Sequence, residues 1–434
     1  MFKKSLIISF SQRSIIMKKT ILLFFVFIST LGFAQNLEKA LPESVGMSST
    51  RLKRIETVVN DYIQKERLAG AIALVMRDGK LVYHESFGYD DINTKTKLSK
   101  DAIVRIASQT KAITSTAVMI LYEEGKILLD EPISKYIPAF KSPVVLDKFN
   151  EADSSFTSIP AKREITIRDL LTHTSGISYL GIGTKEANAI YAKNKISNGL
   201  GDPNLKLADF ANNLAKMPLM HQPGERFTYG LNTDILGYLV EIVSGKPLDV
   251  FFQERIFAPL NMTDTFFYLP ESKHNKLATL YAEDQNRKLI KAPESSQNFP
   301  RQKTGFMSGG GGLSSSATDY AKFLQCLLNG GSLNGKDILS PAIIRQMTTN
   351  QIGEVNVGIR KFGLGFALAT SKEAARLPVS EGNYEWGGIF GTSYWVDPKQ
   401  NIVGIFLTQK YPNSYADLGE KFKVLVYQSL TKLK

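Results

Sequence analysis

Residues 105–114 read RIASQTKAIT, in which Ser108 stands three positions before Lys111. The stretch that follows, ITSTAVMILYEEGKI, has apolar residues at helical spacing and reaches Gly125, which predicts a helix with a glycine C-cap. Residues three apart share one helix face, so the lysine would lie beside the serine hydroxyl. A serine at the first helical position also has an unpaired N–H at the positive end of the helix dipole.

This spacing fits a nucleophile with its base, and it also fits an N-cap serine followed by a solvated lysine. The same spacing recurs at Ser429 and Lys432, where we expect no chemistry. A lysine acts as a base only where burial or a neighbouring positive charge lowers its pKa. The rest of the chain must therefore decide between the two interpretations.

The two ends of the chain predict one antiparallel sheet. The segment AIALVMRDGKLVYHESFGY has two apolar runs around Asp78-Gly79, and GTSYWVDPKQNIVGIFLTQ has two more around Asp397-Pro398. Ser48-Ser49-Thr50 come directly before RLKRIETVVNDYIQKE, which predicts a capped amphipathic helix ahead of the first pair. A helix over 414–433 follows the second pair. We expect these helices to cover a face of the sheet.

The middle of the chain predicts helices that end in glycines, in ITIRDLLTHTSGI, TDILGYLVEIVSG and ATDYAKFLQCLLNGG. The predicted fold is therefore α/β in the α+β sense: an antiparallel sheet with terminal helices, from residues 35–105 and 351–434, and a large, mostly helical insertion over 106–350. Ser108 belongs to this insertion. A cleft between the two parts is the default active-site hypothesis.

The first 34 residues predict a secretory signal peptide. MKKTILLFFVFISTLGFAQN has two lysines, an apolar run and small residues before a cleavage point expected after Ala34, with Met17 the better start. The apolar run is short for a membrane span, although an uncleaved anchor is the alternative. The only cysteine, Cys326, is far from this site, so no lipoprotein anchor is expected. We predict a periplasmic or secreted protein without a stable membrane anchor.

The composition of the 434 residues is that of a globular protein, with 43% hydrophobic and 22% charged residues. The formal charge is +12, and the first 34 residues carry five basic residues and no acid, which leaves +7 on the remainder. No dense basic block follows, so nucleic-acid binding is not expected. A single cysteine excludes an internal disulfide and a cysteine-based zinc site.

Other catalytic patterns are missing from the sequence. The four histidines do not form H-E-x-x-H, and G-x-S-x-G does not occur. The run Gly309–Gly312 lacks the Lys-Ser/Thr of a phosphate loop, so we interpret it as a structural loop at the cleft. His173 is interpreted as holding the turn after its helix. We expect no metal or cofactor.

Five ordered segments carry a family resemblance. They are VRIASQTKAITSTAVMILYEEGKILLDEPISKYIP, ITIRDLLTHTSGI, PGERFTYGLNTDILGYLVEIVSG, GGGGLSSSATDYAKFLQCLLNGG and WGGIFGTSYWVDP. The chain resembles the serine β-lactamase and penicillin-binding-protein superfamily, on the class C β-lactamase-like branch that includes family VIII carboxylesterases. The resemblance covers about residues 43–430. It implies a β-lactamase/transpeptidase-like fold.

The resemblance also implies roles for individual residues. Ser108 would form an acyl-enzyme, Lys111 would accept or relay its proton, and Tyr229 would carry the proton to the leaving group. The motif Trp386-Gly387-Gly388 would lie on an edge strand, where the N–H of Ile389 joins that of Ser108 in an oxyanion hole.

Two departures from the β-lactamase pattern concern substrate binding. Leu231 occupies the position two after Tyr229 where an asparagine is usual, and the asparagine is Asn232, which we expect to bind substrate. Trp386 stands where a lysine is usual. Both changes resemble family VIII esterases. An arginine elsewhere, such as Arg360, is a candidate for the missing positive charge.

The sequence therefore predicts an exported serine hydrolase that acts through an acyl-enzyme on short carboxylic esters. A β-lactamase or D-amino-acid peptidase, acting on β-lactams or cell-wall amides, is the enzymatic alternative. A penicillin-binding sensor that is acylated without turnover is the alternative from another class. The sequence does not specify an oligomeric state.

Overall fold

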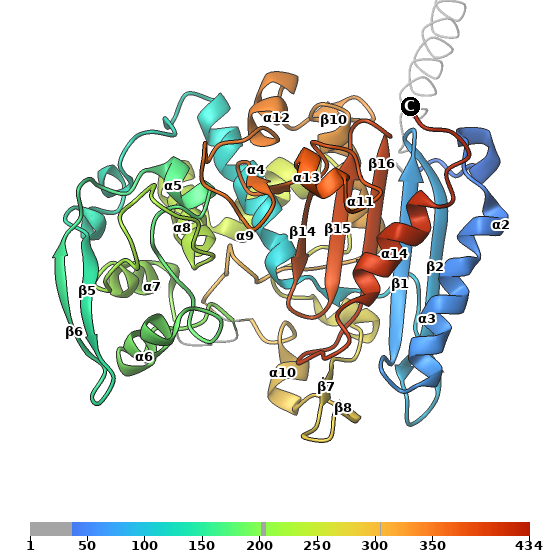
Figure 1. Ribbon diagram of the computed structural model, residues 1–434, viewed down its shortest axis with the longest axis horizontal. Helices are drawn as coiled ribbons and strands as arrows, with labels where there is room; N and C mark the ends of the chain where they lie inside the picture. The colour runs from blue at the N-terminus through green and yellow to red at the C-terminus, as the bar shows by residue number, and fades with distance from the viewer. Residues whose placement is uncertain (1–36, 201–204, 304) are drawn as a thin grey trace, which may run out of the picture. The chain divides into compact units, whose positions relative to one another are not determined.

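The computed structural model describes residues 37–200, 205–303 and 305–434 (Figure 1). Its main feature is an eight-stranded antiparallel sheet of order β12-β13-β14-β15-β16-β1-β2-β3. The strands are β1 (Gly70–Arg77), β2 (Lys80–Asp91), β3 (Thr96–Lys97), β12 (Lys361–Phe362), β13 (Ala367–Leu368), β14 (Tyr384–Gly388), β15 (Thr392–Asp397) and β16 (Ile402–Leu407). The predicted signal peptide lies outside the described residues.

Both predicted hairpins are confirmed. Asp78 and Gly79 connect β1 to β2 with φ of +53° and +73°, the left-handed values that a type I′ turn requires. β15 and β16 pair around residues 398–401. In the sheet, β16 then pairs with β1, which joins the two ends of the chain.

The central strand β1 is buried on both faces. Alternate side chains of a strand point to opposite faces, and two separate hydrophobic cores result. On one face lie Ile72, Leu74 and Met76, and on the other lie Ala71, Ala73 and Val75.

The second core lies under the terminal helices α2 (Ser49–Leu52), α3 (Arg54–Gln64) and α14 (Leu418–Tyr427), which Figure 1 shows along one face of the sheet. Ser48 caps α2 through its side chain, as predicted. The last helix is shorter than the predicted range of 414–433. Its expected first turn is lost because the Ser414 N–H and hydroxyl bind the Glu283 carboxylate instead.

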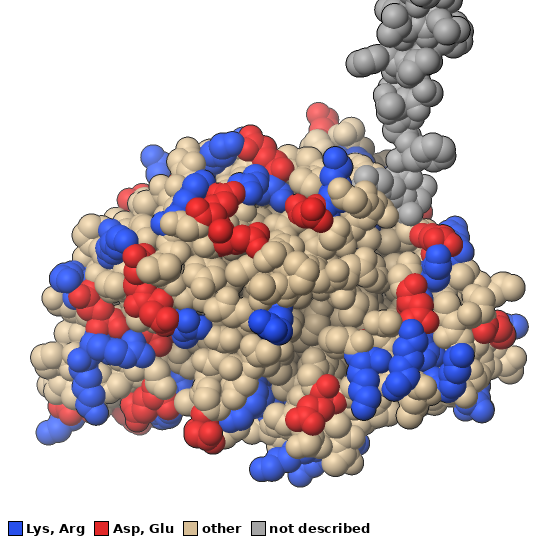
Figure 2. Space-filling model, turned by 90° about the horizontal axis from the view of Figure 1, so that it is seen from above, with Lys and Arg blue, Asp and Glu red and all other residues tan. Residues whose placement is uncertain are grey.

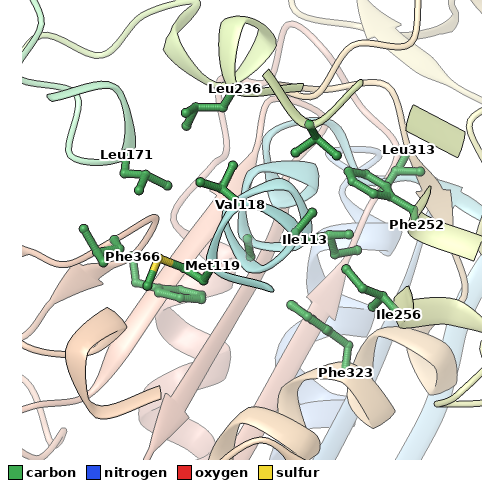
Figure 3. Close-up of a cluster of buried hydrophobic side chains, with 14 of the residues drawn as sticks. Ile113, Val118, Met119, Leu171, Leu236, Phe252, Ile256, Leu313, Phe323 and Phe366 are labelled. Atoms are coloured by element: carbon green, nitrogen blue, oxygen red, sulfur yellow. The ribbon is translucent and has the colours of Figure 1, made fainter. Parts of the chain in front are cut away.

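The first core surrounds α4 (Thr110–Glu123), whose residues 110–121 are all buried. A helix buried on all sides is packed by neighbours from several segments, and Figure 3 shows their side chains pointing toward α4. Ile113, Val118 and Met119 of α4 meet Leu171, Leu236, Phe252 and Phe323, among others. This packing fixes the start of α4, and therefore Ser108.

The region 106–350 contains most of the other helices. They are α5 (Ile167–Leu171), α6 (Lys185–Lys193), α7 (Leu207–Leu214), α8 (Asn232–Ser244), α9 (Leu248–Phe252), α10 (Glu294–Asn298), α11 (Ala317–Leu328) and α12 (Pro341–Met347), with α13 (Ser371–Ala374) beyond it. The short strands pair two by two: β4 (Val104–Arg105) with β9 (Ser314–Ser315), β5 (Val144–Asn150) with β6 (Ser155–Pro160), β7 (Tyr281–Glu283) with β8 (Leu289–Lys291) and β10 (Ser332–Leu333) with β11 (Lys336–Asp337).

Residues 37–434 form one compact unit, and α11 packs directly on β1, β15 and β16. The boundaries between the sheet part and the helical insertion, at residues 105/106 and 350/351, remain predictions. Among the described residues, no helix has the length and apolar character needed to cross a membrane. Lysine and arginine side chains lie among acidic ones over the face seen in Figure 2.

Candidate active site

Ser108 lies in a 3₁₀ turn, Ala107–Gln109, that leads directly into α4. The residue before it, Ala107, has a φ of +45°, which is strained for a residue with a Cβ. Backbone strain of this kind concentrates at functional sites. The turn brings Ser108, half-buried, to the wall of a cavity.

The structure brings Ser108, Lys111 and Tyr229 together. Lys111 Nζ lies 3.1 Å from Ser108 Oγ, and Tyr229 donates a hydrogen bond of 2.6 Å to the same oxygen. Lys111 Nζ lies 4.8 Å from the centre of the Tyr229 ring. The serine hydroxyl is therefore within proton-transfer distance of two titratable groups.

Lys111 is buried, and its ammonium group is held by three hydrogen bonds. Its side chain is 3% exposed, and Nζ also donates to the Tyr179 hydroxyl at 3.0 Å and to the Gly310 carbonyl at 2.6 Å. These two bonds and the one to Ser108 use all three donors of an ammonium group. Gly310 lies in the glycine run Gly309–Gly312, which was predicted to be a loop at the cleft, and Gly310 and Gly311 do line the cavity.

A buried carboxylate stands behind this set. Asp234, at the start of α8, accepts hydrogen bonds from Ser308 Oγ (2.5 Å) and the Gly310 N–H (3.1 Å). Burial raises the pKa of Asp234, and the charge of Lys111 opposes that rise. Burial also raises the pKa of Tyr179 well above its ordinary value, and Tyr229 and Asp234 raise it further.

The sequence interpretation missed Tyr179, Asp234 and Ser308. Asp234 carried a signal, because an acid inside the otherwise apolar helix TDILGYLVEIV needs a buried partner or a special role. Tyr179 follows the THTSGI segment without a pattern of its own. Nothing in the sequence connects it to Lys111, which is 68 positions away.

His173 holds the segment that carries Tyr229. It lies in the turn after α5, as predicted, and its Nδ1 lies 3.3 Å from the Gly230 N–H and 2.8 Å from Asn232 Nδ2. Its ring packs on the Tyr229 ring at 5.0 Å. Burial lowers the pKa of His173 well below its ordinary value, and Lys111 lowers it further, so the imidazole is neutral.

Asn232 is not brought to the cavity, which corrects the expectation that it binds substrate. Its side chain is fully buried, with one end at His173 and the oxygen accepting a hydrogen bond from Ser175. The physical reason is the spacing: Asn232 stands three positions after Tyr229, one more than is usual. At that position it is the first residue of α8, and its side chain is buried. Its amide supports the wall behind Tyr229.

Trp386, Gly387 and Gly388 lie on β14, and Trp386 and Gly387 line the cavity. β14 is not the edge strand that was expected, because β13 and β12 lie beyond it. β13 pairs only with Tyr384 and Glu385, however, so the end of β14 has no partner strand on that side.

Gly388 packs against the turn that carries Ser108. A Cβ at Gly388 would overlap the Ile106 carbonyl, so the close approach requires glycine. Ile389 follows, and it lines the cavity beside Ser108. The Trp386 indole packs against the Tyr229 ring in a tilted arrangement, with ring centres 5.3 Å apart and Nε1 3.4 Å from the Tyr229 oxygen.

The cavity has a volume of about 660 Å³ and mostly apolar walls. Among the described residues that line it, Arg360 and Glu385 are the charged ones. The apolar and aromatic lining residues are Ala107, Tyr179, Leu180, Ile182, Leu200, Tyr229, Trp386, Ile389, Phe390 and Tyr411. No group of three or more His, Cys, Asp or Glu side chains in the described part of the chain is arranged to hold a metal ion.

Comparisons with known proteins agree with this fold. The family model described as Beta-lactamase matches residues 55–428. An uncharacterized protein of Mycobacterium tuberculosis is 34% identical over 85% of this chain and 92% of its own length. Esterase EstB of Burkholderia gladioli is 29% identical over 82% of this chain and 89% of its own length.

Among solved structures, EstCE1, described as a hydrolase with promiscuous acyltransferase activity, superposes with a TM-score of 0.75. It is 27% identical, and the match covers 87% of this chain and 99% of that one. The chain belongs to the Beta-lactamase family, within the serine β-lactamase and penicillin-binding-protein superfamily. It is a serine hydrolase.

Proposed function

We propose that this protein is an exported enzyme that cleaves uncharged carboxylic esters through an acyl-enzyme on Ser108. The observation that carries the proposal is the position of Ser108 Oγ, between Lys111 Nζ and the Tyr229 hydroxyl, on the wall of a largely apolar cavity. The similarity to esterase EstB supports the ester as substrate.

In the first step, Ser108 Oγ attacks the ester carbonyl carbon and its proton passes to the Lys111–Tyr229 pair. The carbonyl oxygen gains the negative charge, and the N–H groups of Ser108 and Ile389 are our candidates to stabilise it. The alcohol leaves with the proton returned by the pair. Water then attacks the acyl-enzyme in the reverse sense, which releases the acid and restores Ser108.

Labelling with a fluorophosphonate, followed by peptide mass spectrometry, tests the nucleophile. The adduct is expected on the peptide that contains SQTK and should be lost in Ser108→Ala. An adduct on the buried Ser178 or Ser308 would contradict the assignment.

The substrate class is tested by comparing kcat/KM for p-nitrophenyl butyrate with that for nitrocefin and for a D-alanyl peptide on one preparation. The ester is expected to be the better substrate. A preference for nitrocefin or the peptide would support the β-lactamase or D-amino-acid peptidase alternative. A burst of one equivalent without further turnover would support a penicillin-binding sensor.

A further inference from the structure

Arg360 reaches the cavity from the residue before β12, and its charge is already neutralised. Its Nε donates to both oxygens of Glu373 at 2.8 Å, and its Nη2 donates to Glu373 as well. On its other side, Nη1 lies 2.8 Å from Glu385. The Arg360 side chain is 29% exposed and the Glu373 side chain only 2%.

Arg360 belongs to a cluster of four charged side chains, with Glu373, Glu385 and Lys423, whose formal charges sum to zero. Glu385 lies on β14, next to Trp386, and it also pairs with Lys423 of α14 and accepts a hydrogen bond from Asn383. Burial opposes ionisation of Glu385, but Lys423 and Arg360 lower its pKa below the ordinary value. Burial likewise opposes the charge of Arg360, and Glu385 and Glu373 raise its pKa above the ordinary value. The geometry thus pairs two basic side chains with two acidic ones.

A substrate carboxylate that entered the cavity near Arg360 would lose its water without gaining a free counter-charge. Two fixed carboxylates already hold the guanidinium, and they repel a third. A neutral ester pays no such cost.

We propose that Glu373 and Glu385 mask Arg360, and that this masking leaves the cavity without a free cation and so favours substrates without a carboxylate near the reacting bond. The inference rests on the proposed function of the Ser108 site and specifies its substrate class. It predicts that one substitution exposes a carboxylate-binding arginine in an otherwise unchanged cavity.

Glu373 is the position for that substitution. Its carboxylate accepts hydrogen bonds from the Arg360 side chain, so Glu373→Gln keeps the shape and raises the charge of the cluster by one. Glu385 is less suitable, because its loss would also leave the buried Lys423 ammonium without its partner.

The assay compares two substrates that differ by one charge and one methyl group: the mono-p-nitrophenyl ester of glutaric acid and its methyl ester. The readout is the ratio of kcat/KM for the acid to kcat/KM for the methyl ester. Glu373→Gln is expected to raise this ratio about 10-fold or more, the usual effect of one charged hydrogen bond. The rise should shrink at high ionic strength.

The double variant Arg360→Gln/Glu373→Gln replaces the ion pair with two neutral amides, of which the one at position 360 is shorter than the arginine. Its ratio is expected to stay within about twofold of the wild-type ratio, because a masked charge contributes little to carboxylate binding. An unchanged ratio in folded Glu373→Gln would overturn the inference. So would a ratio that falls about 10-fold in the double variant, since Arg360 would then already bind carboxylates in the wild type.

A second readout separates this inference from the proposed function. Glutarate and dimethyl glutarate can be compared as competitors of fluorophosphonate labelling at Ser108, which requires no turnover of an ester. If the wild type hydrolyses neither ester, the proposed function fails. The masking of Arg360 is still supported if Glu373→Gln gains protection by glutarate, and it is overturned if it does not.

Discussion

Tyr229→Phe tests whether the contact with Ser108 is catalytic. The substitution removes the hydroxyl that donates to Ser108 Oγ at 2.6 Å. It keeps the ring, which packs against His173 at 5.0 Å, Tyr179 at 5.3 Å and Trp386 at 5.3 Å. The fold and the cavity should therefore be preserved, and a change in rate reports on the hydroxyl alone.

The expected fall in kcat is at least ~10²-fold, the lower end of what a general acid or base contributes. At 1.36 kcal/mol for each factor of ten, this is about 2.7 kcal/mol of transition-state stabilisation. A single hydrogen bond contributes only about 0.5–1.5 kcal/mol to folding, so stability should change little. Lys111→Ala should reduce kcat by at least ~10²-fold too. It also leaves Tyr179 and Gly310 without their donor, and its melting temperature should be lower.

The decisive measurement is a double-mutant cycle on p-nitrophenyl butyrate, with melting temperatures recorded for each variant. Groups that act as one unit are non-additive, so the double variant should be little worse than either single variant. Independent groups would instead give the product of the two losses, about 10⁴-fold. A fully additive result in folded protein refutes the assignment of Lys111 and Tyr229 to one proton-transfer unit.

Three further predictions concern the surroundings of the site. Gly388→Ala should lower kcat at least ~10-fold, because the new Cβ would displace the Ile106 carbonyl and with it the turn that carries Ser108. In the control variant Gly419→Ala the new Cβ meets only the Ser393 side chain. Equal kcat values for the two variants would refute the need for glycine at position 388. Since the pKa of His173 is lower in the folded than in the unfolded protein, protons bind preferentially to the unfolded chain below about pH 6.5, so the melting temperature should fall from pH 7 to pH 5 and fall less in His173→Gln; an unchanged slope would contradict a buried neutral imidazole. Protein exported by the producing cell should begin at Gln35, and N-terminal analysis that finds an intact segment from Met17 in the cytoplasm would refute export.

The parts of the fold that were predicted correctly depend on neighbours in sequence. The Asp78-Gly79 turn, the Ser48 cap and the apolar spacing of α4 are each set within a few residues, and the structure has all three. The two strands that extend the main sheet beyond β14, β12 and β13, were not predictable. β12 and β13 are two residues long, and such strands form only because a neighbouring strand is available.

The errors came from contacts between distant segments. The expected first turn of the last helix, from Ser414, is replaced by contacts with Glu283, which lies 131 positions away. Asn232 was assigned to the substrate because it stands near Tyr229 in the sequence, but His173 and Ser175 hold it inside the protein. The partners of Arg360, Glu373 and Glu385, lie 13 and 25 positions away and had no signal in the sequence.

The two S-x-x-K pairs show what distinguishes a reactive serine from a structural one. Ser429 is fully buried at the end of α14, and its hydroxyl donates to the Val426 carbonyl at 2.6 Å, a local bond that satisfies the helix terminus. Ser108 Oγ instead meets two titratable groups, one of which arrives from a segment 121 positions later.

The reactivity of Ser108 therefore depends on segments of the chain that lie far from the S-x-x-K motif in sequence. Gly310 and Tyr179 hold Lys111 Nζ in place, and His173 holds the backbone beside Tyr229. Each of these contacts crosses at least 57 positions of sequence. The spacing sets only which helix face the lysine occupies; the packing around α4 determines whether that lysine is enclosed, and only an enclosed lysine can exchange a proton with the serine without competition from bulk water.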